Sequence, residues 1–327
     1  MKGLDSWLPI RVGWETGSPF IEWILAPETR FIEPFFEDTV QQVLRHPFHQ
    51  AFRRTTDLNE LTGHSGLPPA GFIFHMSRCG STLISQVLSA SDRNLVLSEA
   101  PPLDSILRAH LRDSEFVCER RARLLRAMLN ALSQPCRPAE ERVFVKFDCW
   151  NITELPIVHE AFPDVPWIFL YRDPVEVLVS QLQKRSRWSL PGALPPATFG
   201  FTAQDLEGIP LDEFAARLLG RLVDVAVDHL SRYPGGMLIN FSELPEACFG
   251  RLLHHFDFDP TAGELERMRQ NASHNSKTPG LPYEPDCESK QQAATERVRE
   301  LAARWIEPSY QQLETLRRSA NHAAPRL

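Results

Sequence analysis

The stretch FIFHMSRCGSTLISQVLSAS, residues 72–91, decides the fold of this chain. Its apolar run at residues 72–74 predicts a buried strand, and residues 83–88 carry one apolar helix face. In the turn between them, residues 77–81, backbone N–H groups and the positive end of the helix dipole would point at an anion. The stretch therefore predicts a strand, a phosphate-binding turn and a helix.

The turn differs from the common triphosphate-binding loop in the position of its charge. In the pattern G-x-x-x-x-G-K-[ST] a lysine precedes the hydroxyl residue. Here Ser81 stands at the lysine position, and the positive charge comes earlier, at Arg78. The hydroxyls of Ser81 and Thr82 would add donors for an anion. The alternative is a purely structural turn in which Gly80 supplies an unusual dihedral angle.

From Gly71 onward, short apolar runs alternate with helical patterns, which predicts an α/β fold with a parallel sheet flanked by helices on both faces. The predicted strands are GFIFHM (71–76), NLVLS (94–98), RVFVKF (142–147), VPWIFLY (165–171) and GGMLINF (235–241).

The remaining segments have other compositions. Residues 1–65, rich in aromatic and turn residues, are expected to form an N-terminal accessory segment with a helix in PFFEDTVQQVLRH (34–46), and residues 66–327 the main domain. Residues 189–212 are broken by Pro and Gly, so we expect a lid or substrate loop, or a disordered segment.

Composition excludes several classes of partner. The 327 residues carry a net charge of −7, which argues against broad binding to nucleic acid but leaves room for a local basic pocket. No segment reaches the about 18 apolar residues of a membrane span. The six cysteines are scattered without metal-ligand spacing. We therefore expect a cytoplasmic protein with no nucleic-acid or membrane partner.

A second segment, VPWIFLYRDPVEVLVSQLQKRSRW (165–188), carries another anion signal. Arg172 ends the predicted strand, and Asp173 with Pro174 forms a helix start. On a helix turning about 100° per residue, Ser180 lies nearly beneath Asp173. Arg172 and Ser180 are therefore predicted to bind one anion beside the helix, as a second phosphate site.

These segments together resemble the sulfotransferases that use 3′-phosphoadenosine 5′-phosphosulfate (PAPS). The resemblance spans about residues 68–280 and includes GGMLINFSELPEACFGRLLHHFDFDP (235–260), which is similar to a late strand and helix of that family. It implies a P-loop-like sulfotransferase fold, with the turn as 5′-phosphosulfate loop and the second segment as 3′-phosphate site. The implied nucleotide-binding residues are Ser77, Arg78, Cys79, Gly80, Ser81, Thr82, Arg172 and Ser180.

The family closes a late glycine-rich basic loop over the 3′-phosphate, and NASHNSKTPG (271–280) is this chain's nearest equivalent. It makes Lys277 and Ser276 the candidates for that role. Transfer of the sulfuryl group from a phosphosulfate donor has no obligatory metal, so no metal is expected. The absence of a triphosphate-binding lysine from the turn agrees with such a donor. Asp148, which follows a strand, is the one metal-ligand candidate left open. Cys79 is interpreted as a small structural residue rather than a nucleophile.

Sulfuryl transfer needs a base, and positive charge on the transferring group. Glu99 is the predicted base because it follows the second strand, where strand ends converge, and because the resemblance implies a Glu there. Its alternative is a helix-cap carboxylate, and His75 and His274 are competing bases. Arg78 is the first candidate for the positive charge on the transferring group, and Lys146 is the second. The alternative interpretation of Lys146 is a solvated lysine at a strand end.

The sequence thus predicts transfer of a sulfuryl group from PAPS to a hydroxyl or amine of a small acceptor, with PAP as the nucleotide product. The acceptor pocket is expected to include residues 189–212 and the aromatic N-terminal segment. The acceptor's identity and the oligomeric state have no readable pattern. Two other classes stay open: a divergent P-loop kinase, disfavoured by the missing lysine, and a non-catalytic nucleotide-binding module.

Overall fold

The computed structural model describes residues 6–15, 17–26, 29–274 and 286–323. Its centre is a five-stranded parallel sheet in the order β5-β6-β4-β7-β8. The strands are β4 (Pro69–His75), β5 (Asn94–Ser98), β6 (Arg142–Lys146), β7 (Trp167–Tyr171) and β8 (Gly236–Asn240). All five predicted strands and the predicted α/β class are therefore confirmed.

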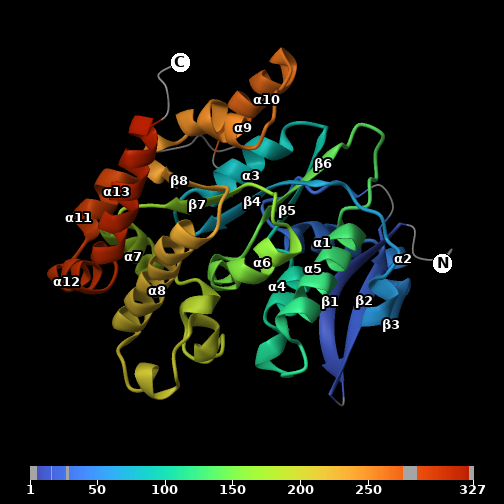
Figure 1. Cartoon of the computed structure of the whole chain (residues 1–327), viewed down its shortest axis with the longest axis horizontal. Helices are drawn as coiled ribbons and strands as arrows, with labels where there is room; N and C mark the ends of the chain where they lie inside the picture. Colours follow the sequence, from blue (N-terminus) through green and yellow to red (C-terminus); the bar gives the residue numbers. More distant parts are fainter. Residues whose placement is uncertain (1–5, 16, 27–28, 275–285, 324–327) are drawn as a thin grey trace.

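The helices divide between the two faces of this sheet according to the direction of each crossover. The connection from β4 to β5 runs one way across the sheet, whereas those from β5 to β6, β6 to β7 and β7 to β8 run the other way. Right-handed crossovers then place the two sets on opposite faces. Figure 1 shows α3, α9 and α10 on one face and α5, α6 and α8 on the other, and α3 packs against α10.

The helix bounds are α3 (Ser81–Ser89), α4 (Pro101–Leu107), α5 (Cys118–Leu132), α6 (Leu155–Ala161), α7 (Pro174–Gln183), α8 (Leu211–Arg232), α9 (Arg251–His255), α10 (Ala262–Ala272), α11 (Cys287–Ala293), α12 (Glu296–Trp305) and α13 (Glu307–Ala323). Among the strands followed by another strand of the sheet, β4 alone sends its crossover to the α3 face. Its neighbours β6 and β7 send theirs to the opposite face, so the carboxyl end of β4 is a switch point of the kind that binds ligands.

A second sheet precedes β4. Strands β1 (Trp7–Glu15), β2 (Ser18–Leu25) and β3 (Arg53–Asp57) form an antiparallel sheet, with α1 (Phe36–Leu44) and α2 (Pro47–Ala51) between β2 and β3. The sheet packs through β1 on α4 and α5, at the end of the molecule opposite α11–α13 (Figure 1). The helix in residues 34–46 is confirmed, whereas this sheet was not among the predicted elements. The division at residue 65 stays a prediction.

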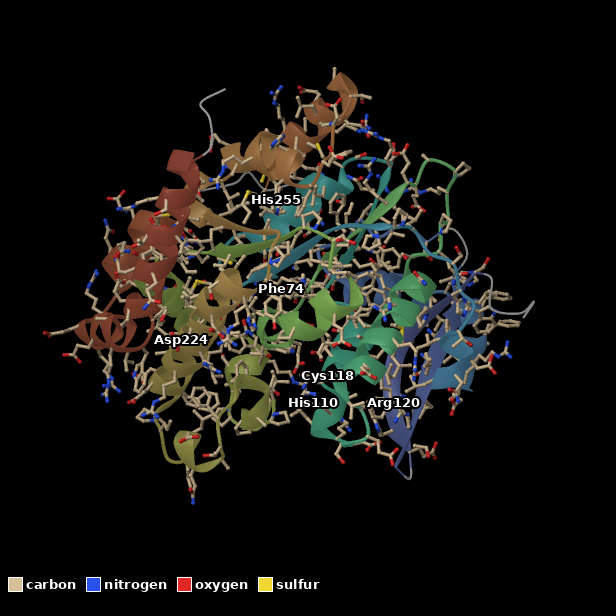
Figure 2. All side chains as sticks on the ribbon, in the orientation of Figure 1. Phe74, His110, Cys118, Arg120, Asp224 and His255 are labelled. Atoms are coloured by element: carbon tan, nitrogen blue, oxygen red, sulfur yellow. The ribbon has the colours of Figure 1, made fainter. Side chains whose placement is uncertain are left out.

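The core lies between the five-stranded sheet and its helices. Phe74 of β4 has no exposed surface and lies at the centre of the molecule (Figure 2). Its ring stacks on Phe147, with centroids 4.9 Å apart, and meets Trp167 edge-on at 6.1 Å. Because helices cover both faces of the sheet, β5 and β7 are buried along their whole length. This packing explains the continuous apolar runs of the sequence.

Residues 189–212 form an ordered part of the fold. They contain 3₁₀ turns at Pro196–Phe199 and Gln204–Leu206, and the side chains of Phe199 and Leu206 are buried. In the part of the chain that the structure describes, no helix is both long and apolar enough to cross a membrane.

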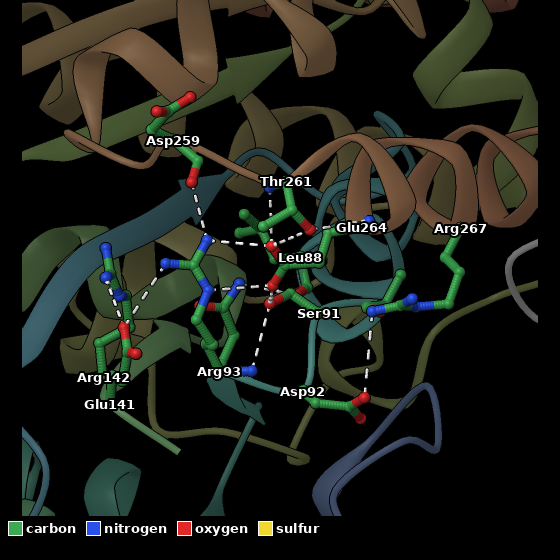
Figure 3. A network of polar contacts seen from close by, with 12 residues as sticks. Leu88, Ser91, Asp92, Arg93, Glu141, Arg142, Asp259, Thr261, Glu264 and Arg267 are labelled. Carbon is green, nitrogen blue, oxygen red and sulfur yellow. Dashed lines mark hydrogen bonds and ion pairs between the residues drawn. The ribbon is translucent and has the colours of Figure 1, made fainter. Parts of the chain in front are cut away.

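Glu264 joins α10 to the edge of the sheet (Figure 3). Its carboxylate accepts hydrogen bonds from the Arg93 guanidinium at 3.0 Å, from the Ser91 hydroxyl, and from the N–H and hydroxyl of Thr261, the residue that caps α10. Burial raises the pKa of Glu264, but these hydrogen bonds outweigh it and lower the pKa to about 2. The ionised carboxylate therefore stabilises the packing of α10 on the sheet.

We predict that Glu264→Gln lowers the free energy of unfolding at pH 7 by about 3 kcal/mol, because the depressed pKa measures how strongly the fold prefers the ionised form. The contribution is complete above the ordinary pKa of 4.5 and is lost as pH falls toward 2. Urea titrations from pH 7 to 3 should therefore show the difference from the native protein shrinking below pH 5. Glu266→Gln, an exposed position of the same helix, is the control. A pH-independent difference would contradict this account.

Candidate active site

Four of the predicted site residues lie where parallel strands end. His75 closes β4, Glu99 follows β5, Lys146 closes β6 and Arg172 follows β7. The backbone joins two of these ends directly, since the Glu99 N–H donates to the Lys146 carbonyl over 2.7 Å. The sheet therefore brings together residues that are up to 97 positions apart, from His75 to Arg172, at its switch point.

The turn after β4 has an uncommon backbone conformation. Ser77, Arg78 and Gly80 have φ of 73°, 52° and 91°, all in the left-handed region. No side chain caps α3 at Gly80, so the N–H groups of its first turn point outward without such a partner. Its φ favours glycine at position 80, and a Cβ there would also come within 2.8 Å of the Leu244 side chain, which would have to shift.

His75 fixes the start of this turn. Its Nδ1 accepts a hydrogen bond from the Ser77 N–H at 3.0 Å, so its Nε2 carries the proton and donates it to the Phe147 carbonyl at 3.1 Å. Burial lowers the pKa of His75 despite Glu99 nearby, and the ring is 4% exposed. With both nitrogens engaged, His75 is suited to positioning the turn rather than to accepting a proton from a substrate.

Glu99 and Lys146 form a buried ion pair beside the turn. The Lys146 Nζ lies 2.8 Å from the Glu99 Oε1, and it also lies 4.6 Å from the centre of the Phe35 ring. Lys146 has no exposed surface, which contradicts the alternative of a solvated lysine. Burial raises the pKa of Glu99, but the Lys146 charge and the nearby His75, whose Nε2 lies 3.5 Å from the Glu99 Oε1, outweigh it and lower the pKa. Glu99 is therefore ionised, and its φ of 55° shows a backbone held in an uncommon conformation.

A cavity of about 480 Å³ lies against Glu99, whose side chain is 24% exposed. Its wall combines three aromatic rings with five carboxylates. The lining residues are Phe35, Glu37, Asp38, Glu99, Pro101, Asp104, Arg108, Asp148, Trp150, Arg187, Trp188, Ala193 and Leu194. Residues of the N-terminal segment and of the loop after α7 thus meet here, where an acceptor pocket was expected.

Two carboxyl groups of the cavity wall differ in their surroundings. Asp104 is bonded to the Arg108 guanidinium, and it accepts hydrogen bonds from the Trp150 indole at 2.7 Å and the Asn151 amide at 2.8 Å. Desolvation, followed by the charges of Glu99 and Asp104, raises the pKa of Asp148 well above its usual range. The cavity therefore offers both a fixed carboxylate and a carboxyl group that favours its protonated form.

Sequence reasoning missed part of this wall. Asp104 and Trp150 were not candidates, although they lie six and four residues after the ends of β5 and β6, two correctly predicted strands. Trp188 precedes the predicted loop, and only its packing on Phe199, with ring centroids 6.0 Å apart, shows which way it faces. Position after a strand was thus the one available signal for the first two.

Arg172 is buried, with 3% of its surface exposed, and is surrounded by acceptors. Its guanidinium donates to Glu176 at 2.7 Å and to Asp286 at 2.6 Å, and it stacks on the Phe241 ring at 3.8 Å. Asp173 accepts from the first N–H groups of α7, so the predicted cap is confirmed. The hydroxyl residue Ser180 lies on α7 and is partly exposed. Its shared phosphate contact with Arg172 stays a prediction.

The other predicted residues have varied positions. Arg78 donates to the Lys184 carbonyl and, over 3.5 Å, to Gln181, so it ties the turn to the end of α7. Burial raises the pKa of Cys79 to about 12, and its thiol donates to the Leu170 carbonyl, which supports a structural role. His274 is exposed at the end of α10, where its Nδ1 lies 2.8 Å from the Gln270 carbonyl.

The hydroxyls of Ser81 and Thr82, in the first turn of α3, are nearly buried, with 6% and 5% of each residue exposed. Lys277 and Ser276 lie outside the described residues. Within the residues that are described, no group of three or more His, Cys, Asp or Glu side chains is arranged to hold a metal ion.

The site thus combines the switch point of an α/β sheet with an ionised acid beside the turn between β4 and α3. Residues 69–207 match the model of the Sulfotransferase family. That segment holds the turn, Glu99, Lys146 and Arg172, so the family that the sequence predicted is the one whose model matches this part of the chain. No curated protein matches the chain in sequence.

Several solved structures are similar to this chain. One is sulfotransferase STF9 from Mycobacterium avium, at 14% identity and a TM-score of 0.46, covering 82% of this chain and 80% of the other. Another is sulfotransferase STF1 from Mycobacterium tuberculosis, at 13% identity and a TM-score of 0.43, covering 75% of this chain and 79% of the other. A third is a sulfotransferase from Alicyclobacillus acidocaldarius, at 14% identity and a TM-score of 0.42, covering 76% of this chain and 96% of the other.

We predict that Lys146→Met raises the pKa of Glu99, because it removes the cation and leaves the burial that opposes ionisation. Infrared spectra at stepped pH, with Glu99→Gln as the reference for assignment, should show protonated Glu99 at a higher pH in the variant. The variant should also lose about 3–5 kcal/mol of stability, since one buried charge loses its partner. Lys184→Met, an exposed lysine, is the control. Equal titration of Glu99 in both proteins would contradict the ion pair.

Proposed function

We propose that this protein transfers a sulfuryl group from PAPS to a hydroxyl or amine of a small acceptor, and releases PAP. The carrying observation is the ion pair of Glu99 and Lys146, which places an ionised acid and a buried cation at one end of an acceptor-sized cavity. This pair supplies two of the groups that such a transfer needs, a proton acceptor and positive charge.

The residues present fit a nucleotide with phosphates at both ends of its ribose. The uncapped first turn of α3 offers N–H groups, and Ser81 and Thr82 add nearly buried hydroxyls for the 5′ end. Arg172 follows the adjacent strand β7 and offers a guanidinium for the 3′-phosphate. When bound, PAPS supplies the activated sulfuryl group. The side chains of this protein would supply the proton acceptor and the positive charge.

Glu99 is the proposed proton acceptor, for geometric reasons. It borders the cavity, whereas the two nitrogens of His75 are engaged inside the protein and His274 is bonded to its own helix. A carboxylate with a strongly lowered pKa is a weak base while Lys146 is paired with it. An anion that draws the charge of Lys146 away would raise the pKa of Glu99. The base would thus gain strength when the donor site is filled.

Positive charge on the transferring group is assigned to Lys146 and Arg78. Lys146 is fully buried, so its ammonium acts in a medium where charge interactions are strong. Burial lowers the pKa of Arg78, which belongs to the turn itself. Residues 77–82, Arg172, Ser180 and Lys277 complete the proposed nucleotide contacts.

Residues 1–65 are proposed as an accessory segment of a catalytic domain that spans residues 66–327. This segment lends Phe35, Glu37 and Asp38 to the cavity wall, which supports a part in acceptor binding. On the pattern of scattered cysteines, the proposed location is the cytoplasm. No observation favours the kinase or the non-catalytic module over this function, and the two tests below separate all three.

The first test compares nucleotides by calorimetry. Adenosine 3′,5′-diphosphate without metal should bind in the micromolar range or tighter, because both phosphate sites are filled, and adenosine 5′-monophosphate should bind at least 10-fold more weakly. Arg172→Ala should abolish most of this difference. Binding of ATP with magnesium, in place of the diphosphate, would favour the kinase and overturn the proposal.

The second test separates catalysis from binding. Glu99→Gln should keep the affinity for adenosine 3′,5′-diphosphate within about threefold, yet slow transfer of labelled sulfate from PAPS to phenols, alcohols or amines by about 10²–10⁴-fold. Asp38→Asn, the same isosteric change elsewhere in the cavity, should leave turnover far less affected. An unchanged rate in Glu99→Gln would remove Glu99 from the mechanism. No transfer by the native protein, with intact nucleotide binding, would indicate the non-catalytic module.

A further inference from the structure

The carboxylate of Asp286, the residue before α11, lies between two cations. One oxygen accepts from Arg172 at 2.6 Å, and the other lies 2.5 Å from the Lys290 Nζ. Both cations are nearly buried, with 4% and 10% of their side chains exposed, whereas 46% of the Asp286 side chain is exposed. A solvent-accessible carboxylate thus covers two buried cations.

The charges around this contact balance only while Asp286 is present. Arg172 and Lys290 face the two carboxylates of Asp286 and Glu176. Burial raises the pKa of Asp286, but Lys290 and Arg172 outweigh it and lower the pKa, so the group is ionised at neutral pH. If its side chain turns outward, a net charge of +1 is left in a desolvated place, which is costly without a replacement anion.

We propose that Asp286 occupies the place of the nucleotide's 3′-phosphate, and that Lys290 joins Arg172 in binding that phosphate once Asp286 has moved away. This inference rests on the proposed function, because it takes the Arg172 site to be the 3′-phosphate site. A carboxylate and a phosphate can each present two oxygens to two cations, so one can replace the other.

Other contacts of α11 allow the exchange. The Gln291 amide donates to Asp173 over 3.0 Å, and Cys287 contacts the Arg172 guanidinium at 3.4 Å, so α11 is attached to α7 without Asp286. Lys290 points inward from the same helix and would stay in place. Only the exposed carboxylate has to rotate toward solvent.

The exchange has a cost for nucleotide binding. Each molecule with a 3′-phosphate must displace an acid that is always present at its site, which weakens its apparent affinity. A nucleotide with a 3′-hydroxyl makes no such exchange, so Asp286 does not oppose its binding. Asp286 therefore lowers the preference for the 3′-phosphate, and Lys290 raises it.

Calorimetric titration of the full-length protein tests both residues. Asp286→Asn should bind adenosine 3′,5′-diphosphate about 5–10-fold more tightly, with adenosine 5′-monophosphate unchanged within twofold. Lys290→Met should bind the diphosphate about 10-fold more weakly, again without effect on the monophosphate, and Lys290→Arg should restore most of the loss. Glu288→Gln removes one exposed negative charge from the same helix and should change neither affinity.

The outcomes separate this inference from the function on which it rests. If the native protein binds no diphosphate, both proposals fall. If the native protein binds it but Asp286→Asn binds no more tightly, or Lys290→Met binds equally well, the inference alone is wrong. Thermal unfolding of each variant shows whether it is folded, and Lys290→Gln serves where Lys290→Met does not fold.

Discussion

The turn between β4 and α3 is the constraint on which the rest of the structure depends. Its chain must pass through the left-handed region at Ser77, Arg78 and Gly80 within four residues, and two of these have a Cβ that opposes this conformation. Such a path persists only where the surroundings fix it. His75 holds one side through the Ser77 N–H, and Arg78 holds the other through the end of α7. The order of the strands and the packing of α7 therefore support a backbone shape that is unfavourable on its own.

Beside this turn lies a fully buried lysine, and lysine is rarely buried in proteins. Lys146 has no contact with solvent, and its charge is met by Glu99 and by the face of Phe35. Replacing such a pair by apolar groups is often neutral or stabilising, so folding alone does not explain it. The proposed role in chemistry would explain it, because the same ion pair keeps Glu99 ionised inside the protein. Arg172 shows a similar arrangement on the other side of β4, with Asp286 in place of Glu99.

The sequence predicted the sheet well because parallel strands covered on both faces must be apolar throughout, and the five runs are. It also located His75, Glu99, Lys146 and Arg172, since each ends or follows one of those runs. It did not predict the antiparallel sheet of β1–β3, whose strands mix buried and exposed positions, nor the pairing of Lys146 with Glu99, which are 47 positions apart. Asp286 and Lys290 lay beyond its reach, because only the packing of α11 on α7 brings them to Arg172.

The position of Phe35 over Lys146 also bears on how the chain acquires its structure. Phe35 is synthesised 111 residues before the lysine that it covers, and β6 cannot enter the sheet until β4 and β5 exist beside it. The first strands of the chain therefore emerge from the ribosome long before the surface on which they pack. Contacts this distant in sequence slow folding, so the N-terminal aromatic residues spend that interval without their partners. We therefore expect the contact between Phe35 and Lys146 to form late in folding. It needs both the N-terminal segment and the completed five-stranded sheet.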